Sequence, residues 1–346
     1  MSKRIVIAGG GTGGHIFPAI AIANALKEID KNIELLFVGA KGKMEMEKIP
    51  QAGYKIEGLD IAGFNRSSLI KNIALPFKLT KSFFQVRSIF KRFRPDAVIG
   101  VGGYSSFPVL RLAQAKGIPA FIHESNSFAG RSNIMLGKKA TKIFTGTDGM
   151  EKFFPRDKIV VTGNPVRASI SHSMISRAEG IKFFSLEEGK KTVLVVGGSL
   201  GAKSINEAID KHLDELLKAG LQVIWQTGKQ YVRKATEDAI ENKGVWVNAF
   251  INQMEYAYAA ADIVVSRSGA MTVAELCVVK KPVLFVPYPF AAEDHQTVNA
   301  KQLVNKNAAL MVKDSEALDK VVPMVIDLAK DKNKQNELKK ILEHLL

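Results

Sequence analysis

The sequence predicts an α/β protein made of two doubly wound, Rossmann-like domains that face each other across a cleft. A chain of 346 residues favours two domains of similar size over a single core. An apolar strand that runs into a glycine-rich turn occurs twice, at residues 4–15 and 192–202. Such a turn before a helix lets the backbone approach a diphosphate and points free amide groups at its charge. We therefore expect phosphate chemistry between the two domains.

Strands and helices alternate along the whole chain. Short, continuously apolar runs indicate strands that are covered on both faces, which is typical of parallel sheets. The strands that we expect lie at residues 5–8, 35–38, 97–101, 120–123, 143–145 and 159–162 in the first half, and at 193–196, 223–226, 245–248, 263–266, 283–286 and 309–312 in the second.

The domain boundary is predicted at a cluster of helix-breaking residues, 163–167. We assign residues 1–163 to the first domain and 164–330 to the second. Residues 331–346 form a lysine-rich amphipathic pattern, and we expect this last helix to pack back onto the first domain.

Composition is that of an ordinary globular protein, with 46% hydrophobic and 24% charged residues. The single cysteine, Cys277, excludes an intramolecular disulfide and fits a reducing compartment. Neither a secretory signal nor an apolar run of membrane-spanning length is visible, so we expect a cytosolic chain. The net charge of +15 indicates an anionic partner: nucleic acid, lipid headgroups or a phosphorylated substrate.

The distribution of positive charge favours lipid headgroups. Residues 64–95 contain no acid, and basic side chains alternate there with leucine, isoleucine and phenylalanine at helical spacing. This pattern is typical of a helix that lies in a membrane interface. It also fits a helix whose apolar stripe is core and whose outer face is simply basic. A nucleic-acid groove is less favoured, because no reader motif accompanies the charge.

An oxidoreductase that binds a dinucleotide is a rival interpretation of the glycine turns. Such an enzyme needs an acidic residue at the end of the second strand to hold the ribose. That strand ends at Lys41 in the first half and near Gln226 in the second. Neither position offers a carboxylate, although Lys41 leaves room for a 2′-phosphate.

His15 directly follows the first glycine turn, where an imidazole can act as general base near neutral pH. Its alternative role is to cap or pack the helix. Two further loops follow predicted strands, at residues 102–108 and 123–126. Ligands of open α/β sheets collect at such strand ends. Glu124 in the second loop is a catalytic candidate, or else a structural partner of a nearby Arg or Lys.

A strand that ends in Ser-Arg-Ser-Gly at residues 266–269 leads into a helix whose amino terminus can receive a phosphate. Glu275, one turn into this helix, can accept hydrogen bonds from a ribose diol, or it is present only because the helix dipole favours it. The proline-shaped loop that follows, residues 287–299, carries clustered amides. Amides suit sugar hydroxyls because they both donate and accept, and they can equally cap the next helix.

Together, the motifs GGTGGH, GGYSSFP, HESN, GNPVR, GGSLGA, SRSGAMTVAEL and PYPFAAEDHQTVNA closely resemble the MurG family, in the same order and nearly end to end. The resemblance implies a GT-B glycosyltransferase that moves N-acetylglucosamine (GlcNAc) from UDP-GlcNAc to the C4 hydroxyl of N-acetylmuramic acid in lipid I, giving lipid II for peptidoglycan synthesis with inversion. It implies an acceptor- and membrane-associating first domain and a second domain that binds UDP-GlcNAc.

The resemblance also assigns site residues. The donor site comprises Thr12, Gly13, Gly14, Asn126, Arg167, Ser199, Ile251, Ala270, Met271, Thr272, Val273, Ala274, Glu275, Gln296 and Asn299. Within this set, Glu275 would hold the ribose, the backbone of Ile251 the uracil, and Gln296 with Asn299 the GlcNAc. Loops around Gly10, Gly11, Gly103, Tyr104 and Ser105 would face the acceptor diphosphate, and His15 would be the base. Leu200 departs from the family, where many members have a polar residue, so only backbone contacts to the donor phosphates are expected there.

No Asp-x-Asp motif and no His/Cys cluster at metal spacing is present, so we expect no metal and no other cofactor. The lipid acceptor favours a peripheral position at the cytoplasmic face of the bacterial cell membrane, on its anionic surface, with no nucleic-acid partner. Two alternatives remain at this point. A UDP-GlcNAc 2-epimerase would convert the nucleotide sugar without an acceptor, and a basic nucleic-acid-binding protein would explain the charge but not the paired glycine turns.

Overall fold

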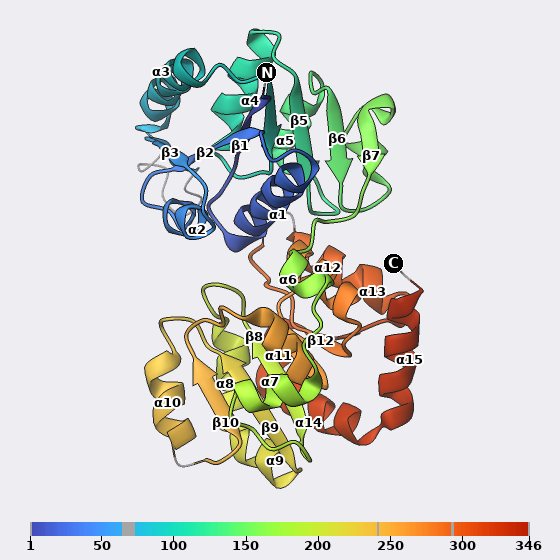
Figure 1. Cartoon of the computed structure of the whole chain (residues 1–346). Coiled ribbons are helices and arrows are strands. Elements are labelled where there is room, and N and C mark those ends of the chain that lie inside the picture. Colours follow the sequence, from blue (N-terminus) through green and yellow to red (C-terminus); the bar gives the residue numbers. More distant parts are fainter. Residues whose placement is uncertain (1, 64–72, 241, 292–293, 345–346) are drawn as a thin grey trace. The chain divides into compact units, whose positions relative to one another are not determined.

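Two parallel sheets organise the chain, one in each of two units, Met1–Arg167 and Ala168–Leu346 (Figure 1). They are seen in a computed structural model that describes residues 2–63, 73–240, 242–291 and 294–344. The first sheet has the strand order β3-β2-β1-β4-β5-β6-β7, and the second has the order β10-β9-β8-β11-β12-β13. Each order reverses once, between β1 and β4 and between β8 and β11, as in a doubly wound fold. The predicted fold class is confirmed within each unit.

The elements of the first unit alternate as expected. Its strands are β1 (Arg4–Ala8), β2 (Glu34–Ala40), β3 (Ile56–Leu59), β4 (Ala97–Gly100), β5 (Ala120–Glu124), β6 (Lys142–Thr145) and β7 (Ile159–Val161). Its helices are α1 (Gly13–Ile29), α2 (Glu45–Gln51), α3 (Leu75–Phe93), α4 (Ser106–Ala115) and α5 (Arg131–Gly137), with short 3₁₀ turns at Met150–Lys152 and Arg156–Lys158.

The second unit repeats this plan. Its strands are β8 (Lys191–Val196), β9 (Leu221–Gln226), β10 (Val245–Asn248), β11 (Ile263–Ser266), β12 (Val283–Phe285) and β13 (Leu310–Met311). Its helices are α6 (Ala168–Ser171), α7 (Arg177–Phe183), α8 (Lys203–Lys211), α9 (Leu213–Lys218), α10 (Val232–Ile240), α11 (Met254–Ala260), α12 (Ala270–Val279), α13 (His295–Val304), α14 (Ala317–Lys330) and α15 (Lys332–Glu343), with a 3₁₀ turn at Asp314–Glu316.

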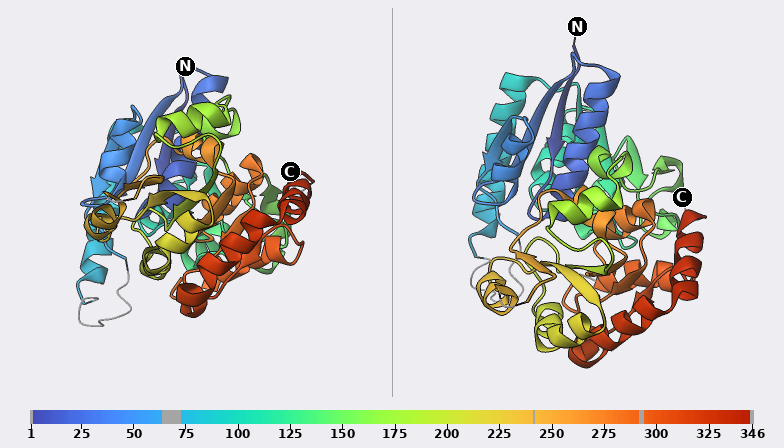
Figure 2. Two further views of the ribbon diagram at one scale, coloured as in Figure 1. Left: turned by 90° about the horizontal axis from the view of Figure 1, so that it is seen from below. Right: turned by 60° about the horizontal axis from the view of Figure 1, so that its bottom comes forward.

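Helices cover both faces of the first sheet, which explains the apolar runs within its strands. Alternate residues of β1 enter different cores: Val6 packs with residues of α3, α4 and α5, whereas Ile7 packs with residues of α1 and α2. Figure 2 shows α1 and α3 from two further directions, on opposite sides of this sheet. The carboxyl ends of the strands are therefore the part of the sheet where loops can present polar groups.

The last helix belongs to the second unit. We expected residues 331–346 to pack on the first domain, but Leu338 of α15 lies in the same core as residues of β8, α8 and α14. Gln335 donates from Nε2 to the carbonyl of Leu328 at 2.6 Å, and Lys280 forms an ion pair with Glu343 at 3.7 Å. Burial of the leucine face against α14 fixes this position.

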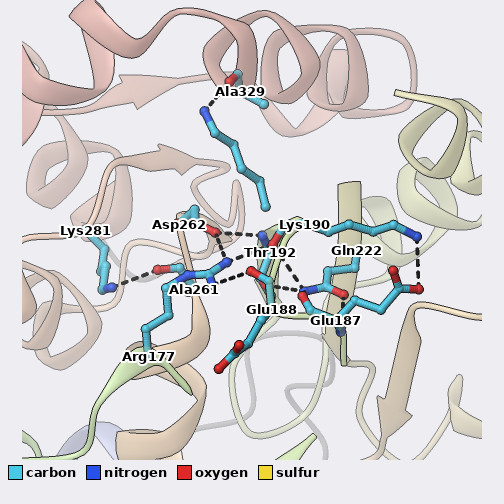
Figure 3. A network of polar contacts seen from close by, with 11 residues as sticks. Arg177, Glu187, Glu188, Lys190, Thr192, Gln222, Ala261, Asp262, Lys281 and Ala329 are labelled. Atoms are coloured by element: carbon cyan, nitrogen blue, oxygen red, sulfur yellow. Dashed lines mark hydrogen bonds and ion pairs between the residues drawn. The ribbon is translucent and has the colours of Figure 1, made fainter. Parts of the chain in front are cut away.

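A polar network closes the amino-terminal edge of the second sheet (Figure 3). Arg177 pairs with Asp262 at 3.0 Å, and the same carboxylate accepts the backbone N–H of Thr192 at 2.8 Å. Gln222 donates to the Thr192 hydroxyl at 2.9 Å and to the Glu187 carbonyl at 2.8 Å. These bonds fasten α7 and the segment after it to the start of the sheet, at the end opposite the glycine loops.

Candidate functional site

In each unit the candidate residues lie at the carboxyl ends of the strands. The first unit places Gly10, Gly11 and Thr12 after β1 and Gly103 and Tyr104 after β4, the pair of strands between which the order reverses. The second unit places Ser199 after β8 and the 267–269 turn after β11, at its own reversal. This is where ligands of open α/β sheets bind.

The loops after β1 and β4 are in direct contact. Gly103 has a φ of 80°, and a methyl group on its Cα would lie 2.4 Å from the carbonyl oxygen of Gly10. A methyl group on Gly9 would lie 2.3 Å from Cγ2 of Val101. No side chain fits at such distances, so glycine is required at Gly9 and Gly103 for the two loops to approach this closely.

A carboxylate that sequence reasoning missed shapes the first loop. Glu45, at the start of α2, is fully buried and accepts the backbone N–H of Gly11 at 2.9 Å and that of Ala40 at 3.0 Å. A methyl group on Gly10 would lie 2.3 Å from its carboxyl carbon. The Gly11 amide, which we expected to be free for a diphosphate, is thus already used within the protein. No sequence signal identifies Glu45, because its partners are backbone groups.

His15 lies in the first turn of α1 and packs against the second loop. A methyl group on Gly102 would lie 2.6 Å from Cε1 and 2.7 Å from Nδ1 of the imidazole. His123, at the end of β5, is only 3% exposed. Burial lowers the pKa of His123 to about 4, and the nearby His15 acts in the same direction. Near neutral pH, His123 is therefore uncharged, and His15 is the partly exposed imidazole at this edge.

Glu124, the last residue of β5, is hydrogen-bonded to amides of the following loop and of α5. Its Oε1 accepts the backbone N–H of Asn126 at 3.0 Å, and its Oε2 accepts from the Gly130 N–H at 3.0 Å and from Asn133 Nδ2 at 2.9 Å. The sequence leaves open a catalytic role for Glu124 or a pairing with Arg or Lys. The bonds to backbone and side-chain amides hold the carboxylate and fix the position of Asn126.

The remaining candidates of the first unit are placed as follows. Thr12 is the residue at which α1 begins, and Gly13 and Gly14 form its first turn. The guanidinium of Arg167 lies 4.7 Å from the centre of the Phe17 ring, over α1. Tyr104 is partly buried, and burial, together with Glu45, raises the pKa of its hydroxyl. Ser105 is 1% exposed, so its hydroxyl points into the protein.

In the second unit, Gln226 joins two loops of the expected donor site. Its Nε2 donates to the Gly198 carbonyl at 2.9 Å, and its Oε1 accepts the Ile251 N–H at 2.9 Å. Of the backbone groups of Ile251 that we expected to meet uracil, the N–H is therefore engaged by Gln226. From the sequence, Gln226 is notable only because it is not a carboxylate. A polar residue at the end of an apolar strand was the signal that could have pointed to this role. Leu200, in the glycine loop, is 78% exposed.

Helix α12 carries the segment Ala270 to Glu275. It begins after Gly269, with no acidic residue in its first turn, so its first amides and positive dipole end can serve an anion. Glu275 is 7% exposed, and its Oε2 accepts the hydroxyl of Tyr258 from α11 at 3.0 Å. Met271 is buried, whereas Thr272, Val273 and Ala274 are half-buried. Tyr258 was not among the residues that the sequence indicated.

Arg267 is bound within the second unit. Its Nη1 donates to the carbonyls of Val286 and Pro287 at 2.9 and 3.1 Å and to Asp314 at 2.5 Å. Its Nη2 donates to the Ser204 hydroxyl at 3.1 Å. The guanidinium thus ties the turn after β11 to the loops around it.

The amides after β12 take part in the same loop structure. Gln296 Oε1 accepts the N–H of Tyr288 at 3.0 Å. Asn299 is 2% exposed and donates from Nδ2 to the Ser268 carbonyl at 3.2 Å. Of the pair that we expected to bind GlcNAc, Gln296 is the more accessible, and Asn299 contacts the turn that precedes α12.

The basic segment of the first unit forms a mixed surface on α3; residues 64–72 of the predicted stretch lie outside the described residues. Val86, Ile89 and Phe90 are core, but Phe77 and Phe84 are 78% and 67% exposed. Seven residues separate the two phenylalanines, so they share the outer face of the helix. Within the described part of the chain, Lys78, Arg87 and Lys91 of α3 form no ion pair. Lys81 instead pairs with Asp60 at 2.8 Å.

The described residues contain neither a candidate metal site nor a helix that could span a membrane. In residues 2–63, 73–240, 242–291 and 294–344, no group of three His, Cys, Asp or Glu side chains could hold a metal ion. In the same ranges, no helix has both the length and the apolar character needed to cross a bilayer.

Comparison with known proteins identifies the family. Residues 5–145 match the glycosyltransferase family 28 N-terminal domain and residues 192–344 its C-terminal domain. The chain is 52% identical over 330 residues to the UDP-N-acetylglucosamine--N-acetylmuramyl-(pentapeptide) pyrophosphoryl-undecaprenol N-acetylglucosamine transferase of Phocaeicola vulgatus, covering 94% of this chain and 88% of that protein.

Solved structures agree with this assignment. The crystal structure of Acinetobacter baumannii MurG is 30% identical with a TM-score of 0.76, covering 99% of this chain and 95% of that one. A putative UDP-N-acetylglucosamine 2-epimerase from Listeria monocytogenes shares the fold, with a TM-score of 0.69 and coverage of 98% and 91%, but only 11% identity. The chain therefore belongs to the MurG family of N-acetylglucosaminyltransferases, within glycosyltransferase family 28.

Proposed function

We propose that the protein transfers GlcNAc from UDP-GlcNAc to the C4 hydroxyl of N-acetylmuramic acid in lipid I, forming lipid II with inversion at the anomeric carbon. The observation that carries this proposal is the 52% identity to the Phocaeicola vulgatus transferase over 94% of the chain. The motifs of the resemblance lie at the carboxyl ends of the two sheets, which supports it. The likeness to the 2-epimerase structure concerns the fold alone, because the identity is only 11%. We therefore do not propose epimerisation of UDP-GlcNAc for this protein.

The second unit would bind the donor. The first turn of α12 and the loop around Ser199 would receive the diphosphate through backbone amides. Glu275 would accept hydrogen bonds from the ribose hydroxyls, and Gln296 would contact the GlcNAc. Because the Ile251 N–H already donates to Gln226, uracil would meet the Ile251 carbonyl. Asn126, Arg167, Asn299 and residues 12–14 complete the donor set that the family implies.

His15 would act as general base on the acceptor. In the transfer, the C4 oxygen of the acceptor forms a bond to the anomeric carbon, and the bond from that carbon to the phosphate oxygen of UDP breaks. The imidazole takes the proton of the hydroxyl, and the electron pair leaves with UDP. Backbone amides of the Ser199 loop and of α12 would stabilise the negative charge on UDP. UDP is a good leaving group, so no acid is required.

The loops after β1 and β4, with Gly10, Gly11, Gly103, Tyr104 and Ser105, would face the acceptor diphosphate. The Gly11 N–H already donates to Glu45, so it would not bind the diphosphate itself. Its hydrogen bond would instead keep the loop in the conformation that faces the acceptor. The sequence contains no Asp-x-Asp motif, so we propose that the transfer requires no metal. We assign no nucleic-acid partner.

We further propose that the protein works as a peripheral protein at the cytoplasmic face of the cell membrane. The exposed Phe77 and Phe84, together with the lysines and arginines of α3, would contact anionic headgroups and the upper acyl region. This position would bring the first unit to its lipid-linked acceptor.

Incubation with radiolabelled UDP-GlcNAc, with and without a lipid I analogue, tests the function. We expect the label to enter the lipid fraction only when the acceptor is present, and to do so equally in EDTA. Conversion of UDP-GlcNAc to another nucleotide sugar without acceptor would contradict the proposal. So would a failure to label the lipid.

A further inference from the structure

We propose that Tyr258 is a positioning residue that fixes the Glu275 carboxylate for the ribose and thereby sets the preference for a ribonucleotide donor. The inference rests on the proposed role of Glu275. It concerns a residue of α11 that would not itself touch the reacting atoms.

The contact is specific. Tyr258 donates its hydroxyl hydrogen to Glu275 Oε2 at 3.0 Å, from α11 to α12. Tyr258 is 3% and Glu275 7% exposed, so water has little access to the bond. A hydrogen bond from a donor to a carboxylate is stronger than one between neutral groups. The tyrosine is thus well suited to hold a buried carboxylate.

The surroundings hold the tyrosine itself in place. Its neighbours on α11, Ala257 and Ala260, are fully buried, and α11 packs closely against α7 and also contacts β8. The arginine of α7, Arg177, is in turn held by Asp262 at 3.0 Å (Figure 3). The Tyr258 hydroxyl therefore occupies a fixed position relative to the sheet.

A glutamate needs such a partner to bind a diol well. Its terminal torsion is broad, so an unrestrained carboxylate samples many orientations. The two oxygens offer about four acceptor sites. A hydroxyl fixed on Oε2 orients the carboxylate plane, so the ribose hydroxyls would meet a carboxylate of defined orientation. A donor that lacks these hydroxyls gains nothing from this arrangement.

The test compares the binding of UDP with that of 2′,3′-dideoxy-UDP by calorimetry. In Tyr258→Phe, we expect UDP to bind about 3- to 10-fold more weakly, the range of one net hydrogen bond. The affinity for dideoxy-UDP should remain nearly unchanged, so the ratio of the two affinities falls. In turnover assays, KM for UDP-GlcNAc should rise while kcat stays close to that of the wild type.

Tyr231→Phe is the matched control. Tyr231 also donates its hydroxyl to a carboxylate of the second unit, Asp210, at 2.7 Å. Tyr231→Phe removes the same kind of bond, and the ratio of the affinities for UDP and 2′,3′-dideoxy-UDP should not change. Equal weakening of UDP and dideoxy-UDP in Tyr258→Phe would show a merely structural role and overturn the inference.

Glu275→Ala separates this inference from the proposed function. If Glu275→Ala lowers the ratio and Tyr258→Phe has no further effect in that background, both ideas hold. If Glu275→Ala lowers the ratio but Tyr258→Phe alone does not, the positioning role is wrong and the ribose contact stands. If Glu275→Ala leaves the ratio unchanged, the ribose contact itself is wrong, and the inference falls with it.

Discussion

The backbone N–H of Gly11 donates to Glu45 Oε2 at 2.9 Å, so a carboxylate from α2 holds the glycine loop from beneath. The same side chain accepts the N–H of Ala40 at the end of β2. The loop that we propose to face the acceptor diphosphate is thus built around an acidic side chain of the protein itself. That side chain satisfies one buried and one partly buried donor and fixes the course of the loop.

Glu45→Ala should destabilise the first unit. The buried N–H of Ala40 and the partly buried N–H of Gly11 would both lose their acceptor, which lowers the free energy of unfolding by about 2 to 4 kcal/mol. Glu45→Gln keeps one oxygen and should cost less. Urea unfolding followed by circular dichroism measures the effect. An alanine variant as stable as the wild type would show that these bonds contribute little.

His15→Ala should lower turnover by ~10²-fold or more, the usual contribution of a general base. The affinity for UDP should change little, because the imidazole would act on the acceptor hydroxyl. Steady-state kinetics with a lipid I analogue and calorimetry with UDP separate the two effects. Unchanged turnover would remove His15 from the role of base.

His123 should make stability dependent on pH. Its pKa is about 4 in the folded protein and 6.5 as the usual value, so between these pH values the unfolded chain binds a proton that the folded chain does not. Stability should fall as the pH drops from 6.5 towards 4, by at most about 3 kcal/mol from this residue.

To test this, the free energy of unfolding in urea is measured at pH 7.5 and at pH 4.5 for the wild type and for His123→Asn. The variant should lose less stability between these two pH values than the wild type. Circular dichroism is the suitable probe, because Trp225 and Trp246 both lie in the second unit. Equal losses in the two proteins would argue against a buried, neutral His123.

The double substitution of Phe77 and Phe84 by serine should weaken binding to anionic vesicles by about tenfold or more, given the free energy of burying a phenylalanine. Sedimentation with anionic and neutral vesicles measures the partitioning. Met174→Ser, which changes a 93% exposed apolar residue of the second unit, is the control and should bind normally. Salt should weaken wild-type binding; equal partitioning at low and high salt would exclude an electrostatic contribution.

The sequence predicts the strands well because continuous apolar runs identify strands that are buried on both faces. All twelve expected strands occur, with ends that differ by up to two residues. The strand at Ile56–Leu59 was missed, since it lies at the sheet edge and contains Glu57 and Gly58. The motifs correctly predicted that Ser199 follows a strand end, and that His15 and Glu275 lie on helices that begin just after a strand end.

Side chains that act on distant backbone groups could not be predicted. Glu45 meets Gly11 across 34 residues and Gln226 meets Ile251 across 25, and no local pattern encodes either contact. Likewise, a tyrosine on an alanine-rich helix is expected to be core, and only the fold brings Tyr258 to Glu275. The side of the protein on which α15 packs also depends on tertiary contacts of its leucines.

The contact between Gly103 and Gly10 couples the two loops of the first unit. With no room for even a methyl group between them, neither loop can move toward the other without displacing it. A ligand that pushes the turn after β1 toward the turn after β4 would therefore displace the turn after β4 as well. Through Gly102, the same movement would reach the imidazole of His15.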